Sequence, residues 1–185
     1  MATYLDTSVI VARYVPADPA FNEVERFFRT SPEARYISEI SVLELHCVFS
    51  RLIRGGMLIA HLGRSSFADL EIKEKVRVAV EHAIRTWRLT VTTPERTYAR
   101  FPLSRQTIET QHELFEAIRT APALGLKTLD MLHLTYAKTM RETVPDLRTF
   151  TTLDGDIISR RNEIENELGI TVVSPSDTPS GSDQV

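Results

Sequence analysis

The sequence lacks the features that mark several large classes of protein. Cys47 is the only cysteine among 185 residues, so no intramolecular disulfide can form and a reducing, intracellular location is expected. No basic stretch precedes an apolar run at the start, where Asp6 interrupts the first apolar residues, so a secretory signal peptide is not expected. No apolar run approaches the roughly 20 residues that cross a bilayer. We therefore expect a cytoplasmic protein that makes no use of a membrane.

Motifs for two common kinds of ligand site are also missing. No glycine-rich phosphate loop is present, which excludes nucleotide hydrolysis of the P-loop kind. His46, His61, His82 and His112 show no zinc-binding spacing with Cys47. The net charge of −3 argues against a generally basic, non-specific nucleic-acid binder. It leaves room for a nucleic-acid enzyme in which a metal ion and a few arginines hold the phosphates.

What the sequence does contain is an alternation of short apolar segments with longer segments of helical periodicity. This alternation predicts an α/β fold, a three-layer α/β/α domain around a small parallel sheet of about five strands flanked by helices. We expect a single domain over residues 1–173, with a helical elaboration in 56–119, followed by a disordered Ser/Pro/Gly/Asp-rich tail over 174–185. The predicted strands are 4–5, 35–37, 89–91, 147–153 and 170–173, and the predicted helices are 9–14, 21–28, 38–53, 70–87, 107–121, 129–140 and 157–168.

Four acidic residues stand in unusually apolar surroundings. Asp6 follows Thr3-Tyr-Leu5, Glu44 lies in Ser41-Val-Leu-Glu44-Leu, Asp130 in Thr128-Leu-Asp130-Met-Leu-His, and Asp154 in Thr151-Thr-Leu-Asp154-Gly. Each has a purely structural explanation: a helix N-cap for Asp6, a capping box with Ser41 for Glu44, a favourable first helical turn for Asp130, and a turn for Asp154. Asp156 shares the ambiguity of Asp154.

Taken together, the four acids favour a shared cation. Strand C-termini and helix N-termini meet at one edge of a parallel sheet, so the acids should converge on one cleft. Converging carboxylates repel one another and raise one another's pKa unless a cation lies between them. Mg²⁺ prefers such oxygen ligands and keeps several waters, and the chemistry suited to such a site is metal-assisted phosphodiester hydrolysis. Asp6 and Asp130 are the expected metal ligands, with Glu44 and Asp154 completing the site or positioning the attacking water.

Four strings occur in this order along the chain: YLDTSVI, SVLELHCVFSRL, KTLDMLHLTYA and FTTLDGDI. On these strings the chain resembles the PIN-domain nucleases, most closely the VapC-type toxins of toxin–antitoxin pairs, and the resemblance covers residues 3–173. The resemblance implies a Mg²⁺- or Mn²⁺-dependent endoribonuclease, a homodimer and a cognate VapB-type antitoxin that blocks the active site. By this resemblance Asp6, Glu44 and Asp130 match the three core acids and Asp154 the less uniform fourth. Thr7, Ser8 and Thr152 match small hydroxyl positions near the metal, and Ser8 and Thr152 are expected to bind the substrate there. The segment 55–119 departs from the family pattern.

Two side chains near these acids have open roles. Arg51 lies seven positions after Glu44, on the same helical face, where it could bind a substrate phosphate or be solvated. His133 lies on the apolar stripe of its helix, which favours a core or hydrogen-bonded histidine over a base or a ligand.

Two rival functions remain at this stage. A phosphatase of the haloacid-dehalogenase kind would need an aspartate at position 8, where Ser8 stands. The other rival is a PIN-like binding scaffold that has lost catalysis.

Overall fold

The computed structural model describes residues 2–31, 33–56, 67 and 69–177 and contains one five-stranded, wholly parallel sheet. The strand order is β3-β2-β1-β6-β7. The strands are β1 (Ala2–Leu5), β2 (Ala34–Ile37), β3 (Leu89–Val91), β6 (Leu147–Thr151) and β7 (Thr171–Val173). The predicted α/β fold with about five parallel strands is confirmed.

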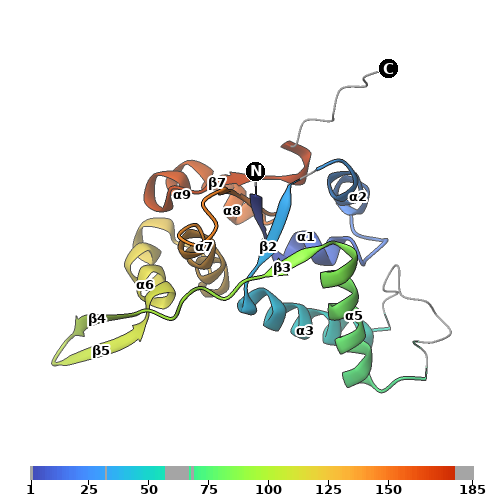
Figure 1. Ribbon diagram of the computed structural model, residues 1–185, viewed down its shortest axis with the longest axis horizontal. Coiled ribbons are helices and arrows are strands. Elements are labelled where there is room, and N and C mark those ends of the chain that lie inside the picture. The colour runs from blue at the N-terminus through green and yellow to red at the C-terminus, as the bar shows by residue number, and fades with distance from the viewer. Residues whose placement is uncertain (1, 32, 57–66, 68, 178–185) are drawn as a thin grey trace.

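Helices cover both faces of this sheet, as Figure 1 shows. Side chains alternate between the two faces of a strand, so Leu5 and Tyr4 of β1 enter different hydrophobic clusters. The cluster that contains Leu5 is completed by α1 (Thr7–Ala12), α2 (Phe21–Thr30), α3 (Glu39–Arg54) and α5 (Ile72–Thr86). The cluster that contains Tyr4 is completed by α6 (His112–Leu124), α7 (Thr128–Met140), α8 (Gly155–Ser159) and α9 (Arg161–Leu168).

The position of β1 at the centre of the sheet places the first acid. β1 pairs in parallel with β2 on one side and β6 on the other, with Tyr4 aligned to Tyr36 and to Phe150. All three strands therefore end at the same edge, where Asp6 leaves β1 and residues 152–154 leave β6. This edge is where open α/β sheets bind ligands.

The segment 56–119 departs most from its sequence-based prediction. Its described residues comprise α5, the edge strand β3, a hairpin of β4 (Tyr98–Leu103) and β5 (Gln106–Gln111), and the start of α6, so strand is mixed with helix. The helix predicted from position 107 was wrong in its first turn, because Thr107 to Gln111 pair with β4 instead. The hairpin projects away from the domain (Figure 1). Residues 57–66 and 68 lie outside the described residues.

Smaller differences concern helix ends. The helix predicted over 157–168 is divided at Arg160 into α8 and α9, and Gly169 closes α9 with a left-handed φ of 68°. In the tail, Pro175–Asp177 form a 3₁₀ turn, and 178–185 lie outside the described residues. None of the described helices is both long enough and apolar enough to cross a membrane.

One buried ion-pair group joins α6 to α7. The Glu116 carboxylate accepts hydrogen bonds from Lys138 Nζ at 2.5 Å and from Arg119 Nη2 at 3.0 Å, and its side chain is 9% exposed. The pKa of Glu116 is lowered to about 2. The hydrogen bond from Arg119 is the largest cause and Lys138 acts in the same direction, while burial opposes both.

The lowered pKa of Glu116 predicts a pH-dependent contribution to stability. A carboxyl with a depressed folded-state pKa stabilises the fold above its unfolded pKa, near 4.3, and loses that contribution as the pH falls toward its folded pKa. Glu116→Gln should therefore lower the melting temperature at pH 7, and the deficit should shrink between about pH 5 and pH 2. The measurement is thermal unfolding across that range, with the exposed Glu142→Gln as control. A deficit that stayed constant with pH would contradict the assignment.

Candidate metal-dependent active site

Asp6 is held at the carboxyl end of β1 by two hydroxyls. It occupies the N-cap position of α1, as its structural explanation predicted, but its carboxylate makes no capping hydrogen bond. Instead Asp6 Oδ2 accepts hydrogen bonds from Ser8 Oγ and Thr152 Oγ1, each at 2.6 Å. The side chain is only 7% exposed, and no hydrogen bond to Oδ1 is found among the described residues. One carboxylate oxygen is therefore fixed while the other stays available to a ligand.

The hydroxyls of Ser8 and Thr152 both donate hydrogen bonds to Asp6 and so hold its carboxylate in place. The Ser8 hydroxyl also accepts a hydrogen bond from the backbone N–H of Leu153, and the Thr152 hydroxyl accepts one from the N–H of Asp154. These bonds join the start of α1 to the segment that leaves β6. The sequence predicted both hydroxyls as substrate-binding groups near the metal, and a substrate role for them stays a prediction.

Glu44 enters the site from α3 and lies against His133. The capping-box explanation for Glu44 was wrong, because the box at the start of α3 is formed by Ser38 and Ser41. Glu44 Oε2 lies 2.8 Å from His133 Nε2. Burial raises the pKa of Glu44, but the hydrogen bond to His133 and the charges of His133 and Arg51 outweigh burial and leave the pKa below its ordinary value. Glu44 is therefore ionised at neutral pH.

His133 belongs to a buried hydrogen-bonded chain. The ring is 2% exposed, and its Nδ1 lies 2.9 Å from the hydroxyl of Tyr4, which in turn contacts the hydroxyls of Ser38 and Ser41. An ionised Glu44 can only accept a hydrogen bond, so Nε2 carries the proton that faces it. The apolar stripe around His133 predicts a core or hydrogen-bonded histidine but gives no partner for it, because Tyr4 and Glu44 come from distant segments of the chain.

Asp6, Glu44 and His133 form the tightest group of potential metal ligands among the described residues, with one ligand atom of each lying within 4.8 Å of the others. Because both ring nitrogens of His133 are engaged with Glu44 and Tyr4, this histidine is better suited to orient Glu44 than to bind a cation directly.

Asp130 is not a member of that group, but the charges of Asp6 and His133 act on it. It stands in the first turn of α7, as predicted. Burial raises its pKa above the ordinary range, and the negative charges of Asp154 and Asp6 raise it further. Its Oδ2 is buried and has no hydrogen-bond partner. An unpaired buried carboxylate oxygen is costly, and an oxygen-seeking cation shared with Asp6 would satisfy it. The residues present therefore fit a hard divalent ion.

The structure separates Asp154 from Asp156. Asp154 Oδ1 caps α8 by accepting hydrogen bonds from the N–H groups of Asp156 and Ile157, at 2.7 and 3.2 Å, and its charge acts on Asp130. Asp156 is turned to the surface, where it lies 3.2 Å from Lys127 Nζ with its side chain 67% exposed. Asp154 therefore has both the predicted turn role and a place beside the acids, and its role as a fourth catalytic acid stays a prediction.

A basic groove lies against α3, the helix that carries Glu44. A cavity of about 580 Å³ between α3 and α5 is lined by the cationic residues Arg51, Arg54 and Lys73, together with others that include His46 and Ser50. Arg51 belongs to this groove and also lowers the pKa of Glu44 through its charge. The charge interaction agrees with a position of Arg51 near Glu44, while phosphate binding by Arg51 stays a prediction.

The PIN domain family matches residues 3–162, and the chain belongs to this family. A solved structure with a similar fold is that of VapBC2 from Rickettsia felis bound to a DNA fragment from their promoter, with a TM-score of 0.50, 13% identity, and coverage of 94% of this chain and 98% of that one. None of the curated proteins matches the chain. The match confirms the resemblance to PIN-domain proteins found in the sequence and indicates nuclease activity in general.

The unpaired oxygen of Asp130 predicts that a divalent metal stabilises the fold. Mn²⁺ that binds only the folded state should raise the melting temperature by roughly 5–10 °C at a hundredfold excess over its Kd. Asp130→Asn should reduce that rise, while the surface variant Asp156→Asn should keep it. The measurement is thermal unfolding over a Mn²⁺ titration. A rise that was equal in all three proteins would place the metal elsewhere.

Proposed function

We propose that this protein is a Mg²⁺- or Mn²⁺-dependent endoribonuclease, the VapC-type toxin of a toxin–antitoxin pair. The observation that carries the proposal is that Asp6 lies in one group of potential ligands with Glu44 and His133, while its charge also acts on Asp130, whose buried oxygen is left unpaired. Membership of the PIN domain family supports nuclease chemistry, and the fold shared with VapBC2 supports the toxin assignment.

The chain's own residues have distinct tasks in this proposal. Asp6, oriented by the hydroxyls of Ser8 and Thr152, and Asp130 would hold the cation. The cation would polarise the scissile phosphate and lower the pKa of a bound water. Glu44, kept ionised and oriented by His133, can accept a hydrogen bond from the attacking water, and Asp154 can help to hold that water.

The substrate class rests on the basic groove. Arg51, Arg54 and Lys73 line this groove, and the charge of Arg51 acts on Glu44, so we infer that a phosphodiester chain bound in the groove would extend to the acids. Fixed cations offset the repulsion between a polyanion and a protein of net charge −3. RNA is the substrate that the toxin assignment implies, and a cytoplasmic location would place the protein together with it.

Two further proposals concern assembly. A VapB-type antitoxin would restrain the nuclease by placing a basic side chain, such as arginine, against the carboxylates of Asp6, Glu44 and Asp130 in competition with the metal. A homodimer is the second proposal. Apolar side chains exposed on the β4–β5 hairpin and on α6 offer a surface for it, namely Tyr98, Leu103, Leu114 and Ile118.

The first test removes the charge of Asp6. Asp6→Asn should abolish metal-dependent RNA cleavage while keeping the fold, because the loss of one charge relieves repulsion in the metal-free protein. The measurement is cleavage of a mixed RNA pool in Mg²⁺ and in Mn²⁺, with circular dichroism as a check on folding and Asp156→Asn as a matched control.

Wild-type cleavage by Asp6→Asn would overturn the proposed site. Metal binding by the wild-type chain without cleavage of any RNA would favour the rival function of a binding scaffold. Sequencing of the cleavage ends would name the RNA.

The toxin assignment has its own test in cells. Expression of the wild-type chain alone should slow growth, expression of Asp6→Asn should not, and co-expression with an adjacent small open reading frame should restore growth and yield a co-purifying complex. A folded, active wild-type nuclease that left the growth of its native host unchanged would contradict the toxin assignment and leave the nuclease assignment standing.

A further inference from the structure

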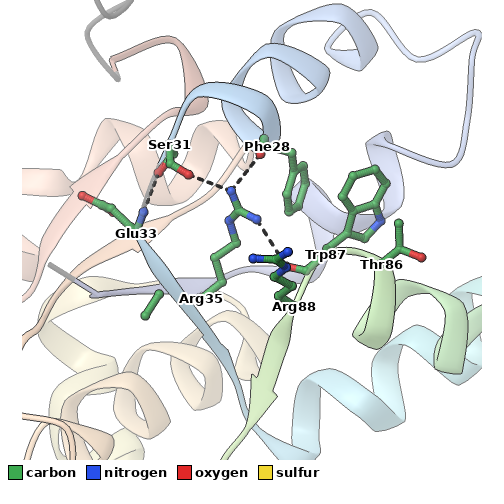
Figure 2. Close-up of a pocket in the computed structure, with 8 residues that line it drawn as sticks. Phe28, Ser31, Glu33, Arg35, Thr86, Trp87 and Arg88 are labelled. Carbon is green, nitrogen blue, oxygen red and sulfur yellow. Dashed lines mark hydrogen bonds between the residues drawn. The ribbon is translucent and has the colours of Figure 1, made fainter.

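A second polar cavity lies at the edge of the sheet opposite the acids. It has a volume of about 470 Å³, and the residues that line it include Phe28, Ser31, Glu33, Arg35, Trp87 and Arg88 (Figure 2). Arg35 is the second residue of β2 and Arg88 directly precedes β3, so both stand at the amino ends of their strands. Asp6 follows the carboxyl end of the parallel neighbour β1, so the cavity is separate from the nuclease site.

Arg35 is fixed in this cavity with donor capacity left over. Its Nη2 donates to the carbonyls of Phe28 and Ser31, both at 2.9 Å, and its Nη1 donates to the carbonyl of Trp87 at 3.2 Å. The guanidinium also lies 4.9 Å from the centre of the Phe28 ring. Its Nε is buried and has no hydrogen-bond partner. A buried donor without an acceptor is uncommon and costs stability.

Arg88 adds a second positive charge to this cavity, and its backbone adopts an unfavourable conformation. Its φ of 51° is left-handed, a conformation that residues other than glycine and asparagine seldom adopt. Figure 2 shows its guanidinium beside that of Arg35. Burial lowers the pKa of Arg35, and the charge of Arg88 lowers it further. Two like charges and a strained backbone at one point call for a compensating interaction.

The described residues offer little negative charge to offset the two guanidiniums. Among the described residues, no carboxylate forms a salt bridge with Arg35 or Arg88. Glu33 lines the cavity and acts on Arg35 only through its charge, and Figure 2 shows its carboxylate directed away from both guanidiniums.

We propose that this cavity binds the phosphate group of a small molecule between Arg35 and Arg88. A phosphate monoester carries close to two negative charges at neutral pH, which matches two guanidiniums, and its oxygens suit the forked donors of Arg88 and the N–H groups that Arg35 has left over. The volume falls in the range of small-molecule pockets and exceeds what a phosphate alone would fill. A guanidinium already lies over each aromatic ring, Arg35 over Phe28 and Arg13 over Trp87, so a stacked base is not part of the proposal.

The chain carries a built-in reporter for this site. Trp87 is its only tryptophan, and its ring lies 4.9 Å from that of Phe28. Intrinsic fluorescence can therefore be titrated with ribose 5-phosphate, inorganic phosphate and ribose at constant ionic strength, with EDTA present to keep the nuclease site free of metal. Ribose 5-phosphate should give a saturable change and ribose none. Tighter binding of ribose 5-phosphate than of phosphate would identify an ester as the ligand, and equal affinity would identify free phosphate.

Arg88→Asn separates binding from structure. Asparagine tolerates a left-handed φ and removes the charge, so the variant should bind about tenfold more weakly or worse while its unliganded melting temperature stays equal or rises. Arg85→Gln, exposed on the last turn of α5, should bind like the wild type. Glu33→Gln, which removes the one negative charge of the lining, should bind more tightly.

The absence of a saturable change up to about 10 mM ligand would overturn the proposal, since that corresponds to negligible affinity. Wild-type affinity in Arg88→Asn would overturn it as well. A lowered melting temperature in Arg88→Asn, with wild-type affinity in Glu33→Gln, would show that Arg88 serves the fold alone.

Discussion

The mutual repulsion of carboxylates at one edge of the sheet is the constraint around which this protein is organised. Parallel pairing of β1 with β2 and β6 brings the ends of these strands together, and Asp6 and Asp154 leave two of them. The raised pKa of Asp130, due first to burial and then to Asp154 and Asp6, shows the cost of that convergence. The fold tolerates this cost because its hydrophobic clusters lie on both faces of the sheet and leave the edge to polar groups.

The carboxylates of Asp6, Glu44 and Asp130 differ in their hydrogen-bond partners, and these differences suit the different roles proposed for them. Hydroxyls from two segments bind a single oxygen of Asp6, the His133 ring fixes Glu44, and Asp130 has a buried oxygen with no partner. The chain from Ser38 and Ser41 through Tyr4 to His133 extends from the start of α3 to the site, so the helix that carries Glu44 also supports the ring that orients it. Burial raises the pKa of Tyr4 above its ordinary value, which keeps this chain uncharged at its centre.

The sequence predicted most of the fold because its local patterns agree with its tertiary structure. All five strands of the parallel sheet and the helices that carry Glu44 and Asp130 follow from local apolar patterns, and the expected convergence of the acids follows from the rules of parallel sheets. The β4–β5 hairpin was missed because Gln106 to Gln111 are mostly polar and because its turn, Ser104-Arg105, is not a two-residue turn motif of the usual kind. Positive φ at Ser104 marks its turn, at a residue type that gives little warning in sequence.

The sequence predicts which acidic residues form the nuclease site better than it predicts the hydrogen bonds between the residues of either site. The contact between His133 and Glu44 spans 89 positions, and the bond between Thr152 and Asp6 spans 146, so no local pattern reports them. Arg35 and Arg88 gave no motif at all, since a single arginine before or within a strand is common. Their proximity depends on the parallel register that aligns Arg35 with Leu89.

The central claim is that Asp6 and Asp130 share a divalent cation, and anomalous diffraction from a crystal grown with Mn²⁺ tests it most directly. The account predicts an anomalous peak within coordination distance of a carboxylate oxygen of each residue, with waters in the remaining positions and Glu44 close enough to contact one of them. A crystal with Mn²⁺ bound only at surface acids such as Asp156, and no peak beside Asp6, would contradict it.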